Sequence, residues 1–311
     1  MRTKFILLLL LCVGAVEAQI RFKPVDKTEY EIWGKEILPT YFRDNTQCKC
    51  QFIVSPSFFP SHALYISDYT NENSQTFAYN YTNILAAKDG KEEMHKMESD
   101  SVSVIKLYSL MKHVLNTSMY CYERMGFDGT RYFIFDGFNG ATCWSPIDND
   151  RIVVNTLENI YKAVVNGNQA EIDAQMPRID SLTVVYKKLY PDDFFSFEES
   201  TGSITNNGKT KHYVRFSTLN DELEFMFVIP KSGYSKGKYM PDVYKEKYLN
   251  ILKNVWRSLF IETSLFDIHG YLQFSIGDKA PIEEKDIILT KDDLTEERLK
   301  EIIVKEISKR K

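Results

Sequence analysis

Strand-like and helix-like segments come in blocks along this chain: a run of strands is followed by helices, and the same order then occurs a second time. The clearest block lies in the second half. Residues 211–217 and 222–229 alternate apolar and polar side chains with the two-residue period of a half-buried hairpin, and residues 242–260 then form an amphipathic helix. There is no strict alternation of single strands and helices. This order predicts an α+β fold in which antiparallel sheets pack against helices.

The same periodicities locate the other elements. We predict further strands at residues 50–54, 63–69, 76–84, 131–136, 141–144 and 271–276, and further helices at residues 29–38, 103–117, 155–165, 169–189 and 292–309. Ser103 is predicted to cap the helix 103–117, and Pro177 to break the helix 169–189. The charged stretch 88–100 has no apolar period, so we predict a solvated loop there.

The pattern of elements changes near residue 190, after the sequence YPDD. We therefore predict two domains of α+β type, residues 19–190 and residues 191–311, preceded by a leader at residues 1–18. A chain of this length can also form one large domain, and that alternative stays open.

Residues 1–18 have the parts of a secretory signal peptide. Arg2 and Lys4 form a short basic start, an apolar run follows, and Val16 and Ala18 supply small side chains where a signal peptidase cuts. We predict cleavage before Gln19 and a mature chain that is exported to the periplasm or the cell exterior.

A membrane anchor and a lipid anchor are the two other interpretations of residues 1–18. A membrane anchor needs about 20 apolar residues, and Glu17 interrupts this shorter run. A lipid anchor on Cys12 would need a small residue before the cysteine, and Leu11 stands there. Both are less consistent with the residues than a cleaved signal peptide, so no integral membrane segment is expected after cleavage.

The charge of the chain argues against a nucleic-acid partner. The formal net charge is −4, and removal of Arg2, Lys4 and Glu17, which together carry +1, leaves −5. Because a nucleic-acid-binding surface needs a basic patch to meet the phosphates, such a partner is not expected.

Four cysteines remain after cleavage: Cys48, Cys50, Cys121 and Cys143. An even number in an exported protein predicts disulfides, and we favour a bridge between Cys121 and Cys143, because both lie at predicted strand ends around one aromatic segment. Cys48 and Cys50 are two residues apart and would share one face of a strand. Buried free thiols are one alternative. A metal site made by all four is the other, but the paired C-x₂-C spacing of structural zinc is missing.

Ser235 lies in Gly233-Tyr234-Ser235-Lys236-Gly237, which matches the G-x-S-x-G pattern of a serine-hydrolase nucleophile. We predict that it is a loop residue and not a nucleophile. Several residues separate the motif from the strand before it and from the helix after it, whereas a nucleophile elbow is a sharp turn. The flanking strands also read as an antiparallel hairpin and not as the parallel sheet of an α/β-hydrolase.

Other side chains that often carry chemistry are scattered. The five histidines are His62, His95, His113, His212 and His269, and they form neither H-E-x-x-H nor H-x₃-H. The adjacent carboxylates are Asp192 with Asp193, Glu198 with Glu199, and Glu283 with Glu284, and we expect them to be solvated. We therefore predict no metal site, no cofactor and no catalytic residue.

Phe77, Tyr79 and Tyr81 are spaced two residues apart, so that a strand would place all three on one face. Such a row can stack on sugars or peptides, and it is our candidate aromatic binding face. Packing of the same rings into a core is the simpler reading.

One segment supports a resemblance to other proteins. Asp128, Gly129, Tyr132 and Phe133, followed by Trp144-Ser145-Pro146 and a helix, form a D-G-x-x-Y-F segment that leads to W-S-P. In this segment, and over residues 50–165 more broadly, the chain resembles a loosely defined group of exported, uncharacterised proteins of Bacteroides-type bacteria. The resemblance implies an α+β fold and a bacterial periplasmic or surface location. It implies no activity.

These observations together favour an exported, non-catalytic protein that binds a protein or a glycan partner. A secreted hydrolase that acts on peptides or glycans is the first alternative, and a positioned histidine would favour it. An inhibitor or immunity-type protein with one tight protein partner is the second.

Overall fold

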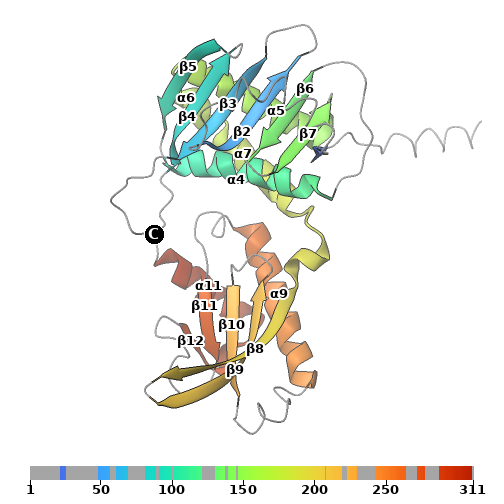
Figure 1. The fold of residues 1–311 in the computed structure, drawn as a ribbon, viewed down its shortest axis with the longest axis vertical. Helices are drawn as coiled ribbons and strands as arrows, with labels where there is room; N and C mark the ends of the chain where they lie inside the picture. Colours follow the sequence, from blue (N-terminus) through green and yellow to red (C-terminus); the bar gives the residue numbers. More distant parts are fainter. Residues whose placement is uncertain are drawn as a thin grey trace, which may run out of the picture. The chain divides into compact units, whose positions relative to one another are not determined.

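The computed structural model describes residues 22–25, 48–56, 61–68, 81–88, 91–99, 101–120, 130–136, 139–144, 146–206, 208–218, 223–229, 242–263, 272–276 and 287–309. The chain divides into two compact units, Met1–Leu189 and Tyr190–Lys311 (Figure 1). Each unit contains a sheet and helices that pack on it, so the predicted α+β fold is confirmed. The predicted helix at 29–38 lies outside the described residues.

The first unit is built on a sheet that has seven strands among the described residues, in the order β1-β7-β6-β2-β3-β4-β5. The strands are β1 (Lys23–Pro24), β2 (Cys48–Ser55), β3 (His62–Asp68), β4 (Tyr81–Lys88), β5 (Lys91–Glu98), β6 (Arg131–Phe135) and β7 (Gly140–Trp144). Every described pairing in this sheet is antiparallel, as predicted. The predicted hairpin at 131–136 and 141–144 is confirmed as β6 and β7.

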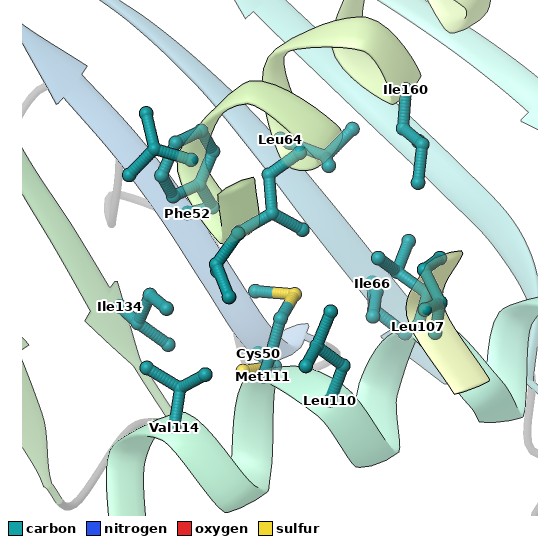
Figure 2. Close-up of a cluster of buried hydrophobic side chains, with 14 of the residues drawn as sticks. Cys50, Phe52, Leu64, Ile66, Leu107, Leu110, Met111, Val114, Ile134 and Ile160 are labelled. Carbon is teal, nitrogen blue, oxygen red and sulfur yellow. The ribbon is translucent and has the colours of Figure 1, made fainter. Parts of the chain in front are cut away.

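Four helices of this unit bury their apolar sides in one core with the sheet. They are α4 (Ser101–Ser118), α5 (Asp148–Val165), α6 (Gln169–Asp173) and α7 (Met176–Lys187). Figure 2 shows the centre of this core, where Met111 and Leu107 of α4 lie close to the strand residues Cys50 and Ile66. The stripe of apolar residues predicted for 103–117 is therefore the buried side of α4.

The opposite face of the same sheet is also buried. Ile53, Tyr65, Phe133 and Phe135 form a separate cluster there, and Val25 packs against it. Burial on both faces explains why residues 50–54 read as a nearly continuous apolar run and not as an alternating strand, since neither set of side chains meets water.

The prediction for residues 88–100 was wrong. Lys91–Glu98 is strand β5, which pairs with β4 along its length. It lies at the end of the strand order and, among the described residues, has β4 as its one neighbouring strand. Charged side chains are common on such edge strands because they discourage pairing with other chains. The charges that suggested a loop are thus compatible with a strand in this position.

Helix ends also differ from the predictions. α4 begins at Ser101, so Ser103 lies inside the helix and is buried instead of capping it. α5 begins at Asp148, seven residues before the predicted start, with Asp148 and Asp150 in its first turn, where the helix dipole favours carboxylates. The predicted helix 169–189 is interrupted as expected, between α6 and α7, and Pro177 stands in the first turn of α7, a position that tolerates proline.

The second unit is built on a sheet with five strands among the described residues, in the order β12-β11-β10-β9-β8. They are β8 (Phe197–Asn206), β9 (Lys209–Thr218), β10 (Leu223–Ile229), β11 (Leu272–Ile276) and β12 (Ile287–Leu289). The predicted hairpin is confirmed as β9 and β10, with Phe216 opposite Phe225. β8 and β12 were not predicted.

The prediction of antiparallel sheets holds only for part of this second sheet. β10 pairs with β11 in parallel, and β11 pairs with β12 in parallel. Helix α9 (Asp242–Glu262) lies in the chain between β10 and β11, as a connection between parallel neighbours requires. The sheet is mixed because the antiparallel hairpin is extended by this crossover.

Helices α9 and α11 (Glu296–Ser308) pack on one face of the second sheet, together with the short turn η1 (Asp192–Phe195) (Figure 1). A second short turn, η2 (Lys291–Asp293), precedes α11, and Leu294 after it joins the same core. The core between the sheet and the helices is rich in aromatic rings from η1, α9 and the central strands. α11 starts four residues later than predicted, and the Thr295 hydroxyl, which accepts a hydrogen bond from the Arg298 amide, caps it.

Candidate functional site

A row of paired residues that includes His62 and Tyr132 crosses the first sheet on the face that carries the helices. His62 of β3 lies opposite Val54 of β2, Val54 lies opposite Tyr132 of β6, and Tyr132 lies opposite Cys143 of β7. Directly opposite residues point to the same face, and neighbouring strands are about 4.8 Å apart. His62 and Tyr132 are therefore about 10 Å apart on one face, at the same end of the sheet.

Helix α5 supplies the partners of His62. The imidazole Nε2 of His62 lies 3.1 Å from the Glu158 carboxylate oxygen Oε2, and both side chains are partly exposed, at 18% and 21%. The ring of Tyr161 lies 4.3 Å from the ring of His62. Glu158 and Tyr161 are three residues apart in α5, so they project from the same side of the helix. We call His62, Glu158, Tyr161 and Tyr132 the His62 site.

The hydrogen bond to Glu158 fixes the tautomer of the His62 imidazole. An ionised carboxylate can only accept hydrogen bonds, so Nε2 carries the proton and donates it to Glu158. In the neutral ring the other nitrogen, Nδ1, then has a lone pair. Among the described residues neither side chain makes a second hydrogen bond, and neither Nδ1 of His62 nor Oε1 of Glu158 is a buried unpaired atom there. Both atoms therefore face solvent.

The negative charge of Glu158 also affects the pKa of Tyr132. The pKa of the Tyr132 hydroxyl is raised above its usual value, first because burial disfavours the phenolate and second because the negative charge of Glu158 repels it; a hydrogen bond with the side chain of Thr130 partly opposes the shift, and Cys143 adds to it. Tyr132 thus stays neutral and can act as a hydrogen-bond donor.

We expect Tyr132 to ionise at higher pH than an ordinary tyrosine, whose pKa is about 10. Because the folded state holds the phenolic proton more tightly, the stability that this proton contributes is present below the ordinary pKa and is lost as the pH rises through the raised one. The tyrosinate absorbance of the wild type minus that of Tyr132→Phe measures this titration. Glu158→Gln should move it to lower pH, and a Tyr132 titration at the ordinary pH would contradict the assignment.

Most residues singled out from the sequence do not join this site. Ser235, Phe77 and Tyr79 lie outside the described residues, and Tyr81 is the first residue of β4. One argument against Ser235 is weakened, because the strand before its motif, β10, has a parallel neighbour as well as an antiparallel one. The prediction that Ser235 is not a nucleophile stays a prediction.

The structure describes the side chains of two of the predicted disulfide candidates, Cys50 and Cys143. Cys50 and Cys143 are buried thiols in the first core, and no disulfide is seen among the described residues. Cys121 lies outside them, so its proposed bridge to Cys143 stays a prediction. The pairing of β2 with β3 shifts register between Cys48 and Cys50, where a bulge interrupts the two-residue period on which their shared face was predicted.

The remaining candidates are structural where they are described. His113 is buried in α4, and His95 and His212 lie in strands. Asp192 pairs with Arg257, and Glu199 pairs with Lys245. No group of three or more histidine, cysteine, aspartate or glutamate side chains that could hold a metal ion occurs in the described part of the chain.

Sequence reasoning missed the His62 site. His62 was seen as one scattered histidine, and Glu158 as an ordinary helix residue, because 96 positions separate them. Tyr132 was named only through the D-G-x-x-Y-F resemblance. The sequence contains two signals that could have been used. Glu158 and Tyr161 lie three residues apart on the predicted helix and therefore share one side of it, and predicted strands of the same unit begin with polar residues.

No protein-family model, no curated protein and no solved structure matches this chain. Among the helices of the described residues, none is both long enough and apolar enough to cross a membrane.

Proposed function

We propose that this chain is an exported, non-catalytic protein that binds a protein or glycan partner, and that the His62 site takes part in this binding. The leader at residues 1–18 supports export. The observation that carries the binding proposal is the pair formed by His62 and Glu158, which is held by one hydrogen bond and leaves a further acceptor on each side chain facing solvent. Tyrosine rings beside two such acceptors form a surface that can recognise a ligand.

A secreted hydrolase is the second candidate, and the same pair favours it. A histidine whose one nitrogen donates to a carboxylate presents its other nitrogen as a base. A nucleophile or a bound water would have to lie within hydrogen-bond reach of Nδ1. Among the described residues, Glu158 is the side chain to which His62 is hydrogen-bonded, and no nucleophile is bonded to its other nitrogen. Ligand binding therefore accounts for more of the geometry than catalysis does.

The test compares three forms of the full-length chain, expressed in its own cells and crosslinked in place. We expect mass spectrometry to find a mature chain that starts at Gln19 in the exported fraction, with a reproducible crosslinked partner. Glu158→Gln should reduce the crosslinked yield about tenfold, since it removes a charged hydrogen-bond acceptor. Asp180→Asn is the matched control, because Asp180 is also a partly exposed carboxylate in an ion pair, with Lys106 Nζ at 2.7 Å.

Equal yields from all three forms would contradict a role for the His62 site. A chain that keeps residues 1–18 and stays in the cytoplasm would contradict export. If the purified chain instead turns over ester or peptide substrates, and His62→Gln abolishes that turnover, the hydrolase reading replaces the binding one.

A further inference from the structure

The atoms that the His62 site offers to a ligand are hydrogen-bond acceptors. Nδ1 of the neutral His62 ring has a lone pair, and Oε1 of Glu158 carries part of the carboxylate charge. Both face solvent, since neither is a buried unpaired atom and, among the described residues, neither side chain makes a second hydrogen bond. A ligand must therefore bring donors, and a ligand that brings only acceptors, such as a carboxylate or a phosphate, would be repelled.

The electrostatic field of Glu158 also favours a positively charged ligand. The charge of Glu158 is felt at the hydroxyl of Tyr132, two strands away from His62 across the sheet, where it disfavours the phenolate and raises the pKa. A positively charged donor gains from this field, whereas a neutral hydroxyl gains much less.

The depth of the site limits the shape of the ligand. Only about a fifth of the His62 and Glu158 side chains is exposed, at 18% and 21%, and the Tyr161 ring lies against the imidazole. A slender group on a flexible stem reaches such a recess more easily than a sugar ring does. The ammonium group of a lysine has this shape, carries three donors and no acceptor, and is attracted to the faces of aromatic rings.

From these observations we propose that the His62 site takes the ammonium group of a lysine side chain presented by a protein partner. The ammonium donates to Oε1 of Glu158, whose other oxygen is held by Nε2 of His62, and the ring of Tyr161 lies against that imidazole. This inference rests on the proposed function and narrows it from a protein or glycan partner to a protein with an exposed lysine.

The test uses the full mature chain and three small probes: N-acetyl-lysine methylamide, N-acetyl-norleucine methylamide and methyl glucoside. The nuclear magnetic resonances of the His62 ring, assigned by their loss in His62→Gln, report binding. We expect the lysine probe to shift them saturably, with an affinity that falls as salt is added. The norleucine probe, which keeps the stem but lacks the charge, should bind at least about tenfold more weakly.

Variants separate the site from general effects. Glu158→Gln should weaken the lysine probe about tenfold, whereas Asp180→Asn, which removes a comparable carboxylate from α7, should leave it unchanged. A far-ultraviolet circular dichroism spectrum identical to the wild type shows that Glu158→Gln folds. If it does not fold, His62→Gln, followed by calorimetry with the same probe, gives the equivalent answer.

Several outcomes would overturn the inference. These are an equal response to the norleucine probe, a stronger response to the glucoside, or no response to any probe at the solubility limit. If the lysine probe fails while crosslinking still depends on Glu158, the ligand class is wrong and the proposed function stands. If both fail, the proposed function falls as well.

Discussion

Replacing Trp256 with alanine is expected to lower the free energy of unfolding of the second unit by about 3–5 kcal/mol. Trp256 lies in α9 and is fully buried, with 0% of its surface exposed. Its ring centroid lies 5.2 Å from that of Phe260 and 6.4 Å from that of Phe195, both in edge-on arrangements. Alanine would remove the ring that joins α9 to η1 and would leave a cavity that these rings cannot fill without moving.

Hydrogen exchange is the measurement, because it reports on each unit separately. In Trp256→Ala, the slow amides of Tyr190–Lys311 should lose protection, whereas Trp256→Phe, which keeps an aromatic ring, should lose less. The matched control is Asp192→Asn, which removes the exposed ion pair with Arg257 next to the same core and should cost less than about 1 kcal/mol. A loss below about 1 kcal/mol in Trp256→Ala would contradict the central role of this ring.

The elements that could be predicted from sequence are those whose pattern is set locally. Residues 211–217 and 222–229 alternate because every second side chain of β9 and β10, such as Phe216 and Phe225, enters the core under the helices, and four residues between them allow a hairpin. α4 and α9 were found because their apolar stripes repeat every three to four residues. In each case the cause and the signal lie within about twenty residues.

The elements that were missed owe their structure to neighbours distant in the chain. β5 is a strand because β4 offers it a partner, and its charges are compatible with an edge. β8 is rich in serine, threonine and glycine, which resemble a loop, yet it pairs with β9 along its whole length. The direction in which β11 joins β10 has no local signature either, because parallel pairing is decided by the path of the crossover.

The His62 site follows the same rule. Local pattern places Glu158 and Tyr161 on one side of a helix, and His62 at the start of a strand, but only the packing of α5 on the sheet brings them into contact. A search of the sequence for compact motifs finds residues such as Ser235 and cannot find such a pair. The site could not be predicted, whereas the fold class could.

Replacing Asp150 with alanine is expected to destabilise the first unit by about 3–5 kcal/mol, because two buried donors would lose their acceptor. Asp150 lies in the first turn of α5 with only 5% of its surface exposed. Its Oδ2 accepts a hydrogen bond from the backbone amide of Phe22 at 3.0 Å, and its Oδ1 accepts one from the hydroxyl of Tyr186 in α7. One carboxylate thus joins the segment that leads into β1, α5 and α7.

The loss of Asp150 should be felt most strongly where Phe22 leads into β1. β1 pairs with β7 through Lys23 and Pro24 only, and the amide of Val25 donates to the carbonyl of Gly140 at 2.8 Å. We expect urea unfolding to show the full loss for Asp150→Ala, a smaller loss for Tyr186→Phe, which removes one of the two bonds, and fast exchange of the Val25 amide in Asp150→Ala alone. Because Phe22 is the fourth residue after the predicted cleavage point, unchanged exchange at Val25 would show that β1 is held at the sheet edge by its pairing with β7 and not by Asp150.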